Sequence, residues 1–329
     1  MKVLLLQLDG KLPNVALMRL ASHHRALGDE VELRQAGNMN SLEPRFWDDH
    51  DQVYGSLIFE RSRPLGEQLL STRPGAIVGG TGWDVASTLE QHGITTTNQD
   101  YTLYPRFHSS IGFLQRGCRL RCPFCVVPRK EGKVRSEQTV SELWRGGDAP
   151  RELVLLDNDF FGNPKWRERL AEIRDGAFKV NFNQGLNARF LNEDTAAAVA
   201  TVDYRDWKMK QRKLHTAWDN RKDEKRLMRG LELLVKHGVK PRHITVMMLV
   251  GYWPNETAED REYRRAKLRD FGALPYPMPY VRTPELVGFQ RWIIGAYDKT
   301  VSWEEWCSAN YRPERLDLNS SQQGLWGSP

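Results

Sequence analysis

The sequence predicts an α/β fold in two parts: a small parallel sheet with helices on its faces, followed by an open barrel of six strands with intervening helices. Short apolar runs alternate with amphipathic stretches along most of the chain, which is the pattern of parallel β-α-β units. The 329 residues are enough for two domains, and a hydrophobic fraction of 40% is compatible with packed cores and argues against wholesale disorder.

The first domain is predicted over residues 1–98. Strands are expected at 2–8, 30–35, 52–59, 75–80 and 94–97. Helices are expected at 14–28, 64–74 and 84–93. Gly28 and Gly93 stand where helix C-caps are expected, each directly before a predicted strand. The opening apolar run is interrupted by Gln7 and Asp9, so it predicts a buried strand and not a signal peptide.

The second domain is predicted over residues 110–285, after a polar linker at 99–109. Strands are expected at 110–115, 152–157, 179–184, 214–218, 244–251 and 275–281. Helical patterns lie between them, including 163–176, 192–202, 223–238 and 258–272. Because parallel strands need such crossovers, this series predicts an open (β/α)6 barrel. The remaining residues, 286–329, begin with a tryptophan-rich amphipathic stretch and predict a C-terminal helical extension.

Three cysteines lie within eight residues as C-x3-C-x2-C: Cys118, Cys122 and Cys125. Three thiolates on one loop can bind three irons of a cubane [4Fe–4S] cluster and leave the fourth iron open. Structural zinc is the main alternative, but such sites usually close with four ligands from paired units, and no second pair occurs. A disulfide framework is disfavoured because the cysteines are concentrated in one place, with only Cys307 elsewhere.

The cysteine loop resembles that of the radical S-adenosylmethionine superfamily, whose hallmark is C-x3-C-x-aromatic-C after the first strand of a partial TIM barrel. Phe124 supplies the aromatic residue before the third cysteine. The resemblance implies that the three cysteines hold a [4Fe–4S] cluster whose unique iron binds S-adenosylmethionine. It also implies a reductant such as flavodoxin or ferredoxin, and cleavage of the sulfonium to a 5′-deoxyadenosyl radical. Phe124 is expected beside the cofactor.

Polar residues follow the carboxyl ends of the predicted barrel strands, where barrel active sites gather. They are Asp157, Asn158 and Asp159, then Gln184 and Asn187, then Asp219 and Asn220, and finally Gly251. Each alone is equally explained as a helix N-cap or turn residue, and only their joint placement favours a site. The resemblance implies that Asp157 and Asn158, with Asp159 next, contact the methionine amino group, and that the others bind the same cofactor. No catalytic residue is assigned for later steps.

The first domain resembles the Rossmann-like, cobalamin-binding-like domain that precedes many barrels of this superfamily. Its glycine-rich turn at 79–83 follows a predicted strand, which is where α/β sheets bind ligands. The cobalamin signature D-x-H-x-x-G is missing, so cobalamin is not indicated, although binding without a histidine ligand is left open. The preferred interpretation is a degenerate domain that supports folding or presents substrate.

The net charge of +6 permits a polyanionic partner without requiring one. The basic, tryptophan-containing stretch at 207–226 suits unpaired bases, but a solvated helix face is the favoured interpretation. No stretch approaches about 18 apolar residues, so no membrane span and a cytoplasmic location are expected.

The expected reaction is hydrogen abstraction leading to rearrangement, methylation or sulfur insertion. The acceptor is left open among a nucleoside, an RNA, a peptide and a small metabolite. Radical methylthiotransferases acting on RNA usually carry a cysteine-rich N-terminal domain, and the first hundred residues contain no cysteine. The alternative from another class is a non-catalytic iron–sulfur or zinc module that binds nucleic acid.

Overall fold

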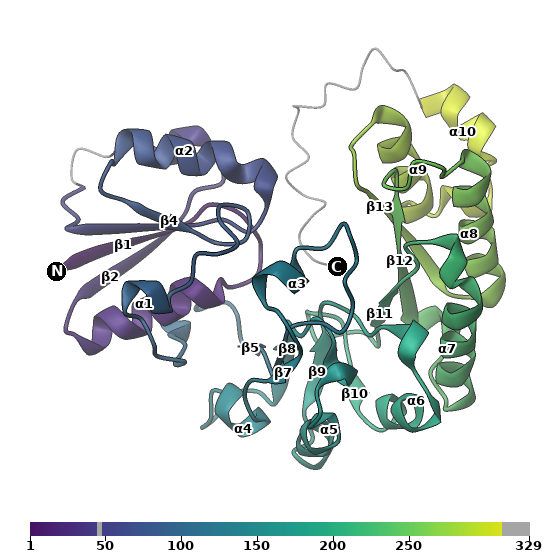
Figure 1. The fold of residues 1–329 in the computed structure, drawn as a ribbon, viewed down its shortest axis with the longest axis horizontal. Coiled ribbons are helices and arrows are strands. Elements are labelled where there is room, and N and C mark those ends of the chain that lie inside the picture. Colours follow the sequence, from purple (N-terminus) through teal and green to yellow (C-terminus); the bar gives the residue numbers. More distant parts are fainter. Residues whose placement is uncertain (45–47, 311–329) are drawn as a thin grey trace. The chain divides into compact units, whose positions relative to one another are not determined.

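A computed structural model describes residues 1–44 and 48–310. Within them the chain forms two compact units, drawn as a ribbon in Figure 1. The first unit comprises residues 1–111 together with 126–132, and the second comprises 112–125 together with the described residues from 133 onward. Each unit has its own hydrophobic core, so each is described by itself.

The first unit contains a parallel sheet with strand order β2-β1-β3-β4. Its strands are β1 (Lys2–Gln7), β2 (Glu30–Gln35), β3 (Gln52–Ser56) and β4 (Ile77–Gly79). Alternate residues of β1 face opposite sides of the sheet. Val3 and Leu5 pack with the buried face of α1 (Val15–Ala26), whereas Leu4 and Leu6 pack with the cluster that includes α2 (Arg63–Thr72). The sheet is therefore covered by helices on both faces, as predicted (Figure 1).

The end of the first unit differs from the prediction. Residues 94–97 form no strand, and the predicted helix at 84–93 is reduced to a 3-10 turn at Glu90–His92. Ile94 is 1% exposed and packs in the cluster formed by Val3, Leu5 and helix α1. The apolar signal at this position therefore reflects one buried side chain and not a strand of the sheet.

The glycine-rich turn follows β4 as predicted, but its glycines are explained by packing. A Cβ on Gly80 would lie 2.1 Å from the Leu57 carbonyl oxygen, and one on Gly82 would lie 2.4 Å from the Phe59 carbonyl carbon. Gly80 also has φ +103°, which L side chains rarely adopt. These glycines let the turn lie against the chain after β3, and no ligand is needed to account for them.

All six strands predicted for the second domain form, but they lie in two parallel sheets. The first has the order β10-β9-β8-β5, with β5 (Ser110–Gly112), β8 (Glu152–Leu155), β9 (Lys179–Phe182) and β10 (Asp203–Tyr204). The second has the order β11-β12-β13, with β11 (Leu214–Ala217), β12 (Ile244–Val250) and β13 (Leu274–Pro279). Between the sheets, the backbone N–H of Leu186 donates to the His215 carbonyl at 2.7 Å. The α/β class with parallel sheets is confirmed, while one continuous barrel sheet stays a prediction.

Helices pack on these sheets around one main core. They are α4 (Val140–Leu143), α5 (Trp166–Asp175), α6 (Glu193–Ala200), α7 (Glu224–Lys236) and α8 (Ala258–Phe271). Helix α7 buries Leu227, Leu231 and Leu234, which share one helix face. Helix α8 begins with a capping box between Thr257 and Asp260. These helices follow the strand ends, so they hold the loops that carry the predicted site residues.

The C-terminal extension is described only as far as residue 310, and the rest of the predicted segment lies outside the described residues. Helices α9 (Pro284–Ile294) and α10 (Trp303–Asn310) bring Trp292, Trp303 and Trp306 into one cluster, against which Cys307 packs. In the described part of the chain, no helix combines the length and the hydropathy that a membrane span requires.

Candidate metal and cofactor site

The cysteine loop leaves the strand pair β6 (Gln115–Arg116) and β7 (Arg135–Ser136), which is antiparallel and closes the loop at its base. Gln115 is fully buried and anchors the start of the loop. Its side-chain amide donates to the Gly117 carbonyl at 2.5 Å, and its side-chain oxygen accepts from the Asp159 backbone N–H at 3.1 Å. Gly117 has φ +80°, so a glycine is favoured at this turn.

Asp157 and Asp159, which follow β8, also anchor the start of the cysteine loop. Arg119 donates two hydrogen bonds to the Asp159 carboxylate, from Nε at 2.7 Å and from Nη2 at 2.9 Å. The Asp157 carboxylate accepts from the Leu114 backbone N–H at 2.9 Å. A Cβ at Gly162 would lie 2.3 Å from Asp159 Oδ2, so glycine makes room for the Arg119 pair. Asp157 and Asp159, which were both predicted to contact the cofactor, therefore help to fix the cysteine loop and the residue before it.

The three thiols are half-buried on this anchored loop. The Cys125 backbone N–H donates to the Cys122 carbonyl at 3.0 Å, which closes a tight turn between these two residues. Burial raises the pKa of Cys118 to about 11 and also raises the pKa of Cys122. Among the described residues, no three His, Cys, Asp or Glu side chains surround one point as ligands of a single metal ion. In a cubane each thiolate binds a different iron, and the cluster itself stays a prediction.

A cation and a carboxyl lie close to Cys122. Arg189 forms an ion pair with Asp223 at 2.5 Å, and Asn187 accepts from Arg189 Nε at 3.0 Å. Burial raises the pKa of Asp219, while Arg189 acts in the opposite direction. Arg189 and Asp219 both influence the pKa of Cys122, so the three side chains are neighbours. The cysteine loop, the segment after β9 and the end of β11 therefore meet at one place.

The other predicted polar residues have different surroundings. Asn220 accepts from the Lys222 backbone N–H at 2.9 Å and caps the short 3-10 helix at Arg221–Asp223. Gln184 is exposed, and Asn158 is half-buried. Asn220 thus has the helix-cap role that the sequence left open as its alternative.

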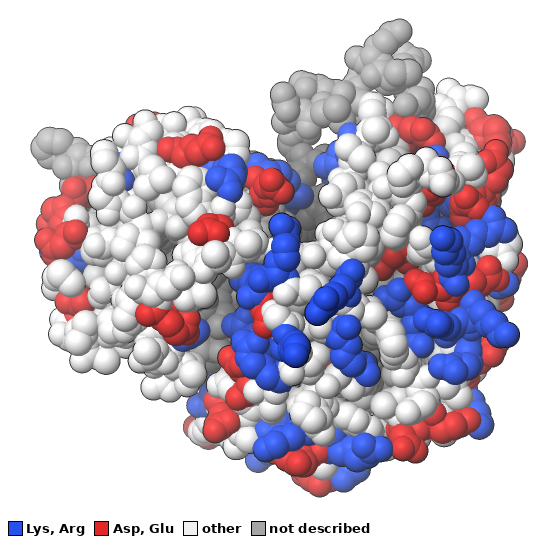
Figure 2. Space-filling model, in the orientation of Figure 1, with Lys and Arg blue, Asp and Glu red and all other residues white. Residues whose placement is uncertain are grey.

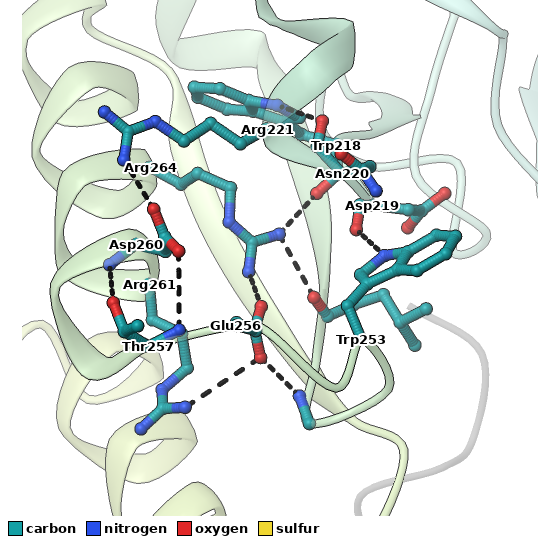
Figure 3. A network of polar contacts seen from close by, with 12 residues as sticks. Trp218, Asp219, Asn220, Arg221, Trp253, Glu256, Thr257, Asp260, Arg261 and Arg264 are labelled. Atoms are coloured by element: carbon teal, nitrogen blue, oxygen red, sulfur yellow. Dashed lines mark hydrogen bonds and ion pairs between the residues drawn. The ribbon is translucent and has the colours of Figure 1, made fainter.

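A buried arginine missed by the sequence reasoning ties α8 to the strand ends, as Figure 3 shows. Arg264 is 1% exposed and donates through Nη1 to the carbonyls of Trp218 at 2.8 Å and Leu249 at 3.1 Å. Its Nη2 pairs with Glu256, whose other carboxylate oxygen accepts from the Gly251 backbone N–H at 2.6 Å. Burial lowers the pKa of Arg264, and the nearby Glu256 carboxylate opposes this. The pair fixes the loops that carry Asp219 and Gly251.

Aromatic side chains adjoin the cysteine loop. The Phe124 ring lies 5.2 Å from that of Tyr252, which in turn lies 4.8 Å from Tyr280, both as edge-to-face pairs. Trp253 packs beside them and donates from its indole N–H to the Asp219 carbonyl at 2.7 Å. Gly251 has φ +77°, and a Cβ there would lie 2.4 Å from a Leu286 methyl group, so this position requires glycine.

A cavity of about 690 Å³ lies elsewhere in the second unit, lined by residues of α8, α9 and α10. None of the predicted site residues lines it. The meeting point of the strand ends, and not this cavity, is therefore the candidate site.

Comparison with known proteins shows a partial similarity to a tRNA-modifying synthase. No family model matches the chain. Over 164 residues it is 26% identical to the tRNA-2-methylthio-N(6)-dimethylallyladenosine synthase of Sulfurihydrogenibium sp. (strain YO3AOP1). The match covers 44% of this chain and 37% of that enzyme. The chain is thus similar to part of a tRNA-modifying synthase.

Proposed function

We propose that this protein is a radical S-adenosylmethionine enzyme. The observation that carries the proposal is the anchored loop with three half-buried thiols that meets Arg189 and Asp219 at the strand ends. The partial similarity to a methylthio-adenosine synthase supports it, because methylthiotransferases acting on RNA are among the enzymes of the resembled superfamily.

The residues present fit the cofactors that the proposal requires. Cys118, Cys122 and Cys125 would hold a [4Fe–4S] cluster, and a bound metal centre would displace the thiol protons despite the raised pKa values. Arg189 places a cation beside the thiols, which would pair with the carboxylate of S-adenosylmethionine. Asp219 places a carboxyl there, which would pair with its ammonium group. Arg264 and Glu256 keep the Asp219 loop in place, and Gln115 and Asp159 keep the cysteine loop in place.

A [4Fe–4S] cluster held by Cys118, Cys122 and Cys125, with a flavodoxin- or ferredoxin-like reductant, would supply one-electron cleavage of S-adenosylmethionine to methionine and a 5′-deoxyadenosyl radical, which would abstract a hydrogen atom from the substrate. The printed name of the relative describes a methylthio-adenosine in tRNA, so a nucleoside acceptor and sulfur insertion are the first candidates for this chain. Methylation and rearrangement are the other candidate reactions, and both also begin with hydrogen abstraction from the substrate.

The test is anaerobic reconstitution with iron and sulfide, followed by dithionite and S-adenosylmethionine. The protein is expected to develop a cluster absorption band and to form 5′-deoxyadenosine. Cys122→Ala should reduce 5′-deoxyadenosine to background, whereas the matched control Cys307→Ala, on α10, should retain it. A metal-loaded protein that forms no 5′-deoxyadenosine would refute the proposal and favour the non-catalytic nucleic-acid-binding module.

A further inference from the structure

Helix α7 carries a row of cations on the side that faces away from its core contacts. The three leucines that α7 buries share one face, and by helical periodicity Lys225, Arg226 and Arg229 lie on the opposite face. Lys222 lies in the short 3-10 helix that leads into α7. All four side chains are exposed. We call this row, Lys222, Lys225, Arg226 and Arg229, the basic stripe.

No carboxylate neutralises the basic stripe. In the described part of the chain, Lys222, Lys225 and Arg226 form no ion pair, and Arg229 donates to a neutral acceptor, the Leu191 carbonyl, at 3.3 Å. Helix α8 differs, because every Lys and Arg residue within it forms an ion pair. Figure 2 shows Lys and Arg side chains gathered over α7 and α8 on the drawn face. The unpaired positive charge of these two helices therefore lies on α7.

The basic stripe is unfavourable for the helix that carries it. Lys225 and Arg226 lie in the first turn of α7, where a cation opposes the helix dipole. Lys225 and Arg229 are like charges four residues apart, and such pairs repel each other. A solvated helix face, which the sequence favoured for residues 207–226, does not explain either cost. An anion bound at this end of the helix would offset both, because the positive end of the dipole attracts it as well.

The basic stripe begins beside the candidate site. Lys222 precedes Asp223, whose carboxylate pairs with Arg189 at 2.5 Å, and Arg189 influences the pKa of Cys122. From Lys222 to Arg229 the stripe extends about 10 Å along the helix, since each residue adds about 1.5 Å. That length suits about three successive phosphates of one nucleic-acid strand. A strand bound along the stripe would therefore end beside the candidate site.

An exposed aromatic ring lies next to the basic stripe. Phe190 is 41% exposed and directly precedes Leu191, whose carbonyl accepts from Arg229. The Arg119 guanidinium of the cysteine loop lies 5.2 Å from the centre of the Phe190 ring. Surfaces that bind single-stranded nucleic acids combine rings on which bases stack with cations that contact the phosphates. The combination favours RNA over an acidic peptide or an anionic membrane.

We propose that the basic stripe binds the phosphates of an RNA strand and that Phe190 stacks on one of its unpaired bases, so that the strand is held beside the candidate site. The inference rests on the proposed function, which has a nucleoside acceptor as its first candidate, and it extends that acceptor from a free nucleoside to a residue of RNA. Phosphate contacts carry no sequence information, so the stripe would position the strand without selecting its sequence.

The experiment measures fluorescence anisotropy of a fluorescein-labelled, single-stranded RNA of about 12 nucleotides with the reconstituted full chain, without reductant, over a series of KCl concentrations. Lys225→Gln/Arg226→Gln removes two phosphate contacts, each worth about 0.7 in the slope of log K against log salt. The slope should fall by about 1.4, and binding at about 0.1 M KCl should weaken about 20-fold. The variant also removes unfavourable cations from the first helix turn, so its melting temperature should not fall below that of wild type.

Two controls separate the position of the charges from the net charge. Lys225→Arg/Arg226→Lys keeps both charges and should bind like wild type. Arg167→Gln/Arg174→Gln removes two exposed cations from α5, where each pairs with a carboxylate, and should change binding less than about twofold. Phe190→Ala should weaken RNA binding about 10-fold, the effect of losing one stacking contact, while binding of inorganic polyphosphate stays unchanged.

Binding is read without turnover, so this inference and the proposed function can fail separately. Formation of 5′-deoxyadenosine by a protein that does not bind the RNA would overturn the inference alone. Stripe-dependent RNA binding by a protein that forms no 5′-deoxyadenosine would overturn the proposed function alone. Equal loss of binding in the α7 and α5 double-glutamine variants would reduce the effect to net charge and overturn the inference. An effect of the α7 variant confined to phosphatidylglycerol vesicles or to polyphosphate would assign the stripe to that anion and overturn it as well.

Discussion

His215 makes the stability of the second unit depend on pH. It lies on β11, 2% exposed, and burial together with the nearby Lys213 lowers its pKa to about 4, while the Phe182 backbone and Asp206 act in the opposite direction. In the unfolded chain the ordinary value is about 6.5. Between these two values the unfolded state binds more protons than the folded state, so protonation favours unfolding. Stability is therefore complete above about pH 6.5 and falls as the pH is lowered toward 4.

The size of the effect follows from the two pKa values. They differ by about 2.5, and each pKa unit corresponds to about 1.4 kcal/mol, which gives about 3 kcal/mol in total. Roughly 2 kcal/mol of this should be lost between pH 7 and pH 5. That is a large part of the stability of an ordinary domain.

The assay is urea unfolding of wild type and His215→Gln at pH 7 and pH 5, followed by tryptophan fluorescence, since most tryptophans belong to the second unit. The free energy of unfolding of wild type should drop by about 2 kcal/mol more than that of His215→Gln. Thr245→Val, at the register partner on β12, retains the imidazole and should keep the wild-type pH dependence. An equal drop in wild type and His215→Gln would refute the reasoning.

Two further substitutions test the packing around the site. Arg264→Met should lower the free energy of unfolding by about 3–5 kcal/mol in urea melts, because it leaves the buried Glu256 carboxylate only its longer pair with Arg261, at 3.9 Å. Arg174→Met, at an exposed pair, should not change it measurably. Gly230→Ala should destabilise by about 1–3 kcal/mol in thermal melts, since its Cβ would lie 1.9 Å from the Ala188 carbonyl oxygen. Gly75→Ala is the control, because no atom lies within 4 Å of a Cβ at Gly75. Similar melting temperatures for the two alanine variants would contradict the close contact between Gly230 and Ala188.

The strands could be predicted because their signal is local. Strand β12 is apolar except for Thr245, and such a run predicts a buried strand wherever it packs. The strand predicted at 94–97 was wrong, because β-propensity does not indicate whether a neighbouring strand is available for pairing. Ile94 packs in the core as a single side chain, and residues 94–97 form no backbone pairing with a strand.

The cysteine loop could be predicted because its three ligands are adjacent in sequence, whereas the surrounding roles depend on distant partners. Asp and Asn after a strand look the same whether they bind a ligand, cap a helix or pair with an arginine. Asn220 caps a turn and Asp159 pairs with Arg119, which only the folded chain distinguishes. Arg264 was missed because two of its partners are backbone carbonyls, one of them 46 residues away, and its ion pair with Glu256 forms only in the folded chain. A charged residue on the core face of α8, one turn from Leu268, was the available signal.

The division of the chain into units has a practical consequence. Residues 126–132, which directly follow the third cysteine, belong with the first unit, while the cysteines themselves belong with the second. The polypeptide therefore leaves the first unit, returns to it for seven residues and leaves it again. No single cut separates the two, and a fragment that began at the cysteine strand would deprive the segment after Cys125 of its own unit. Truncated variants of this protein should therefore keep residues 126–132 together with residues 1–111.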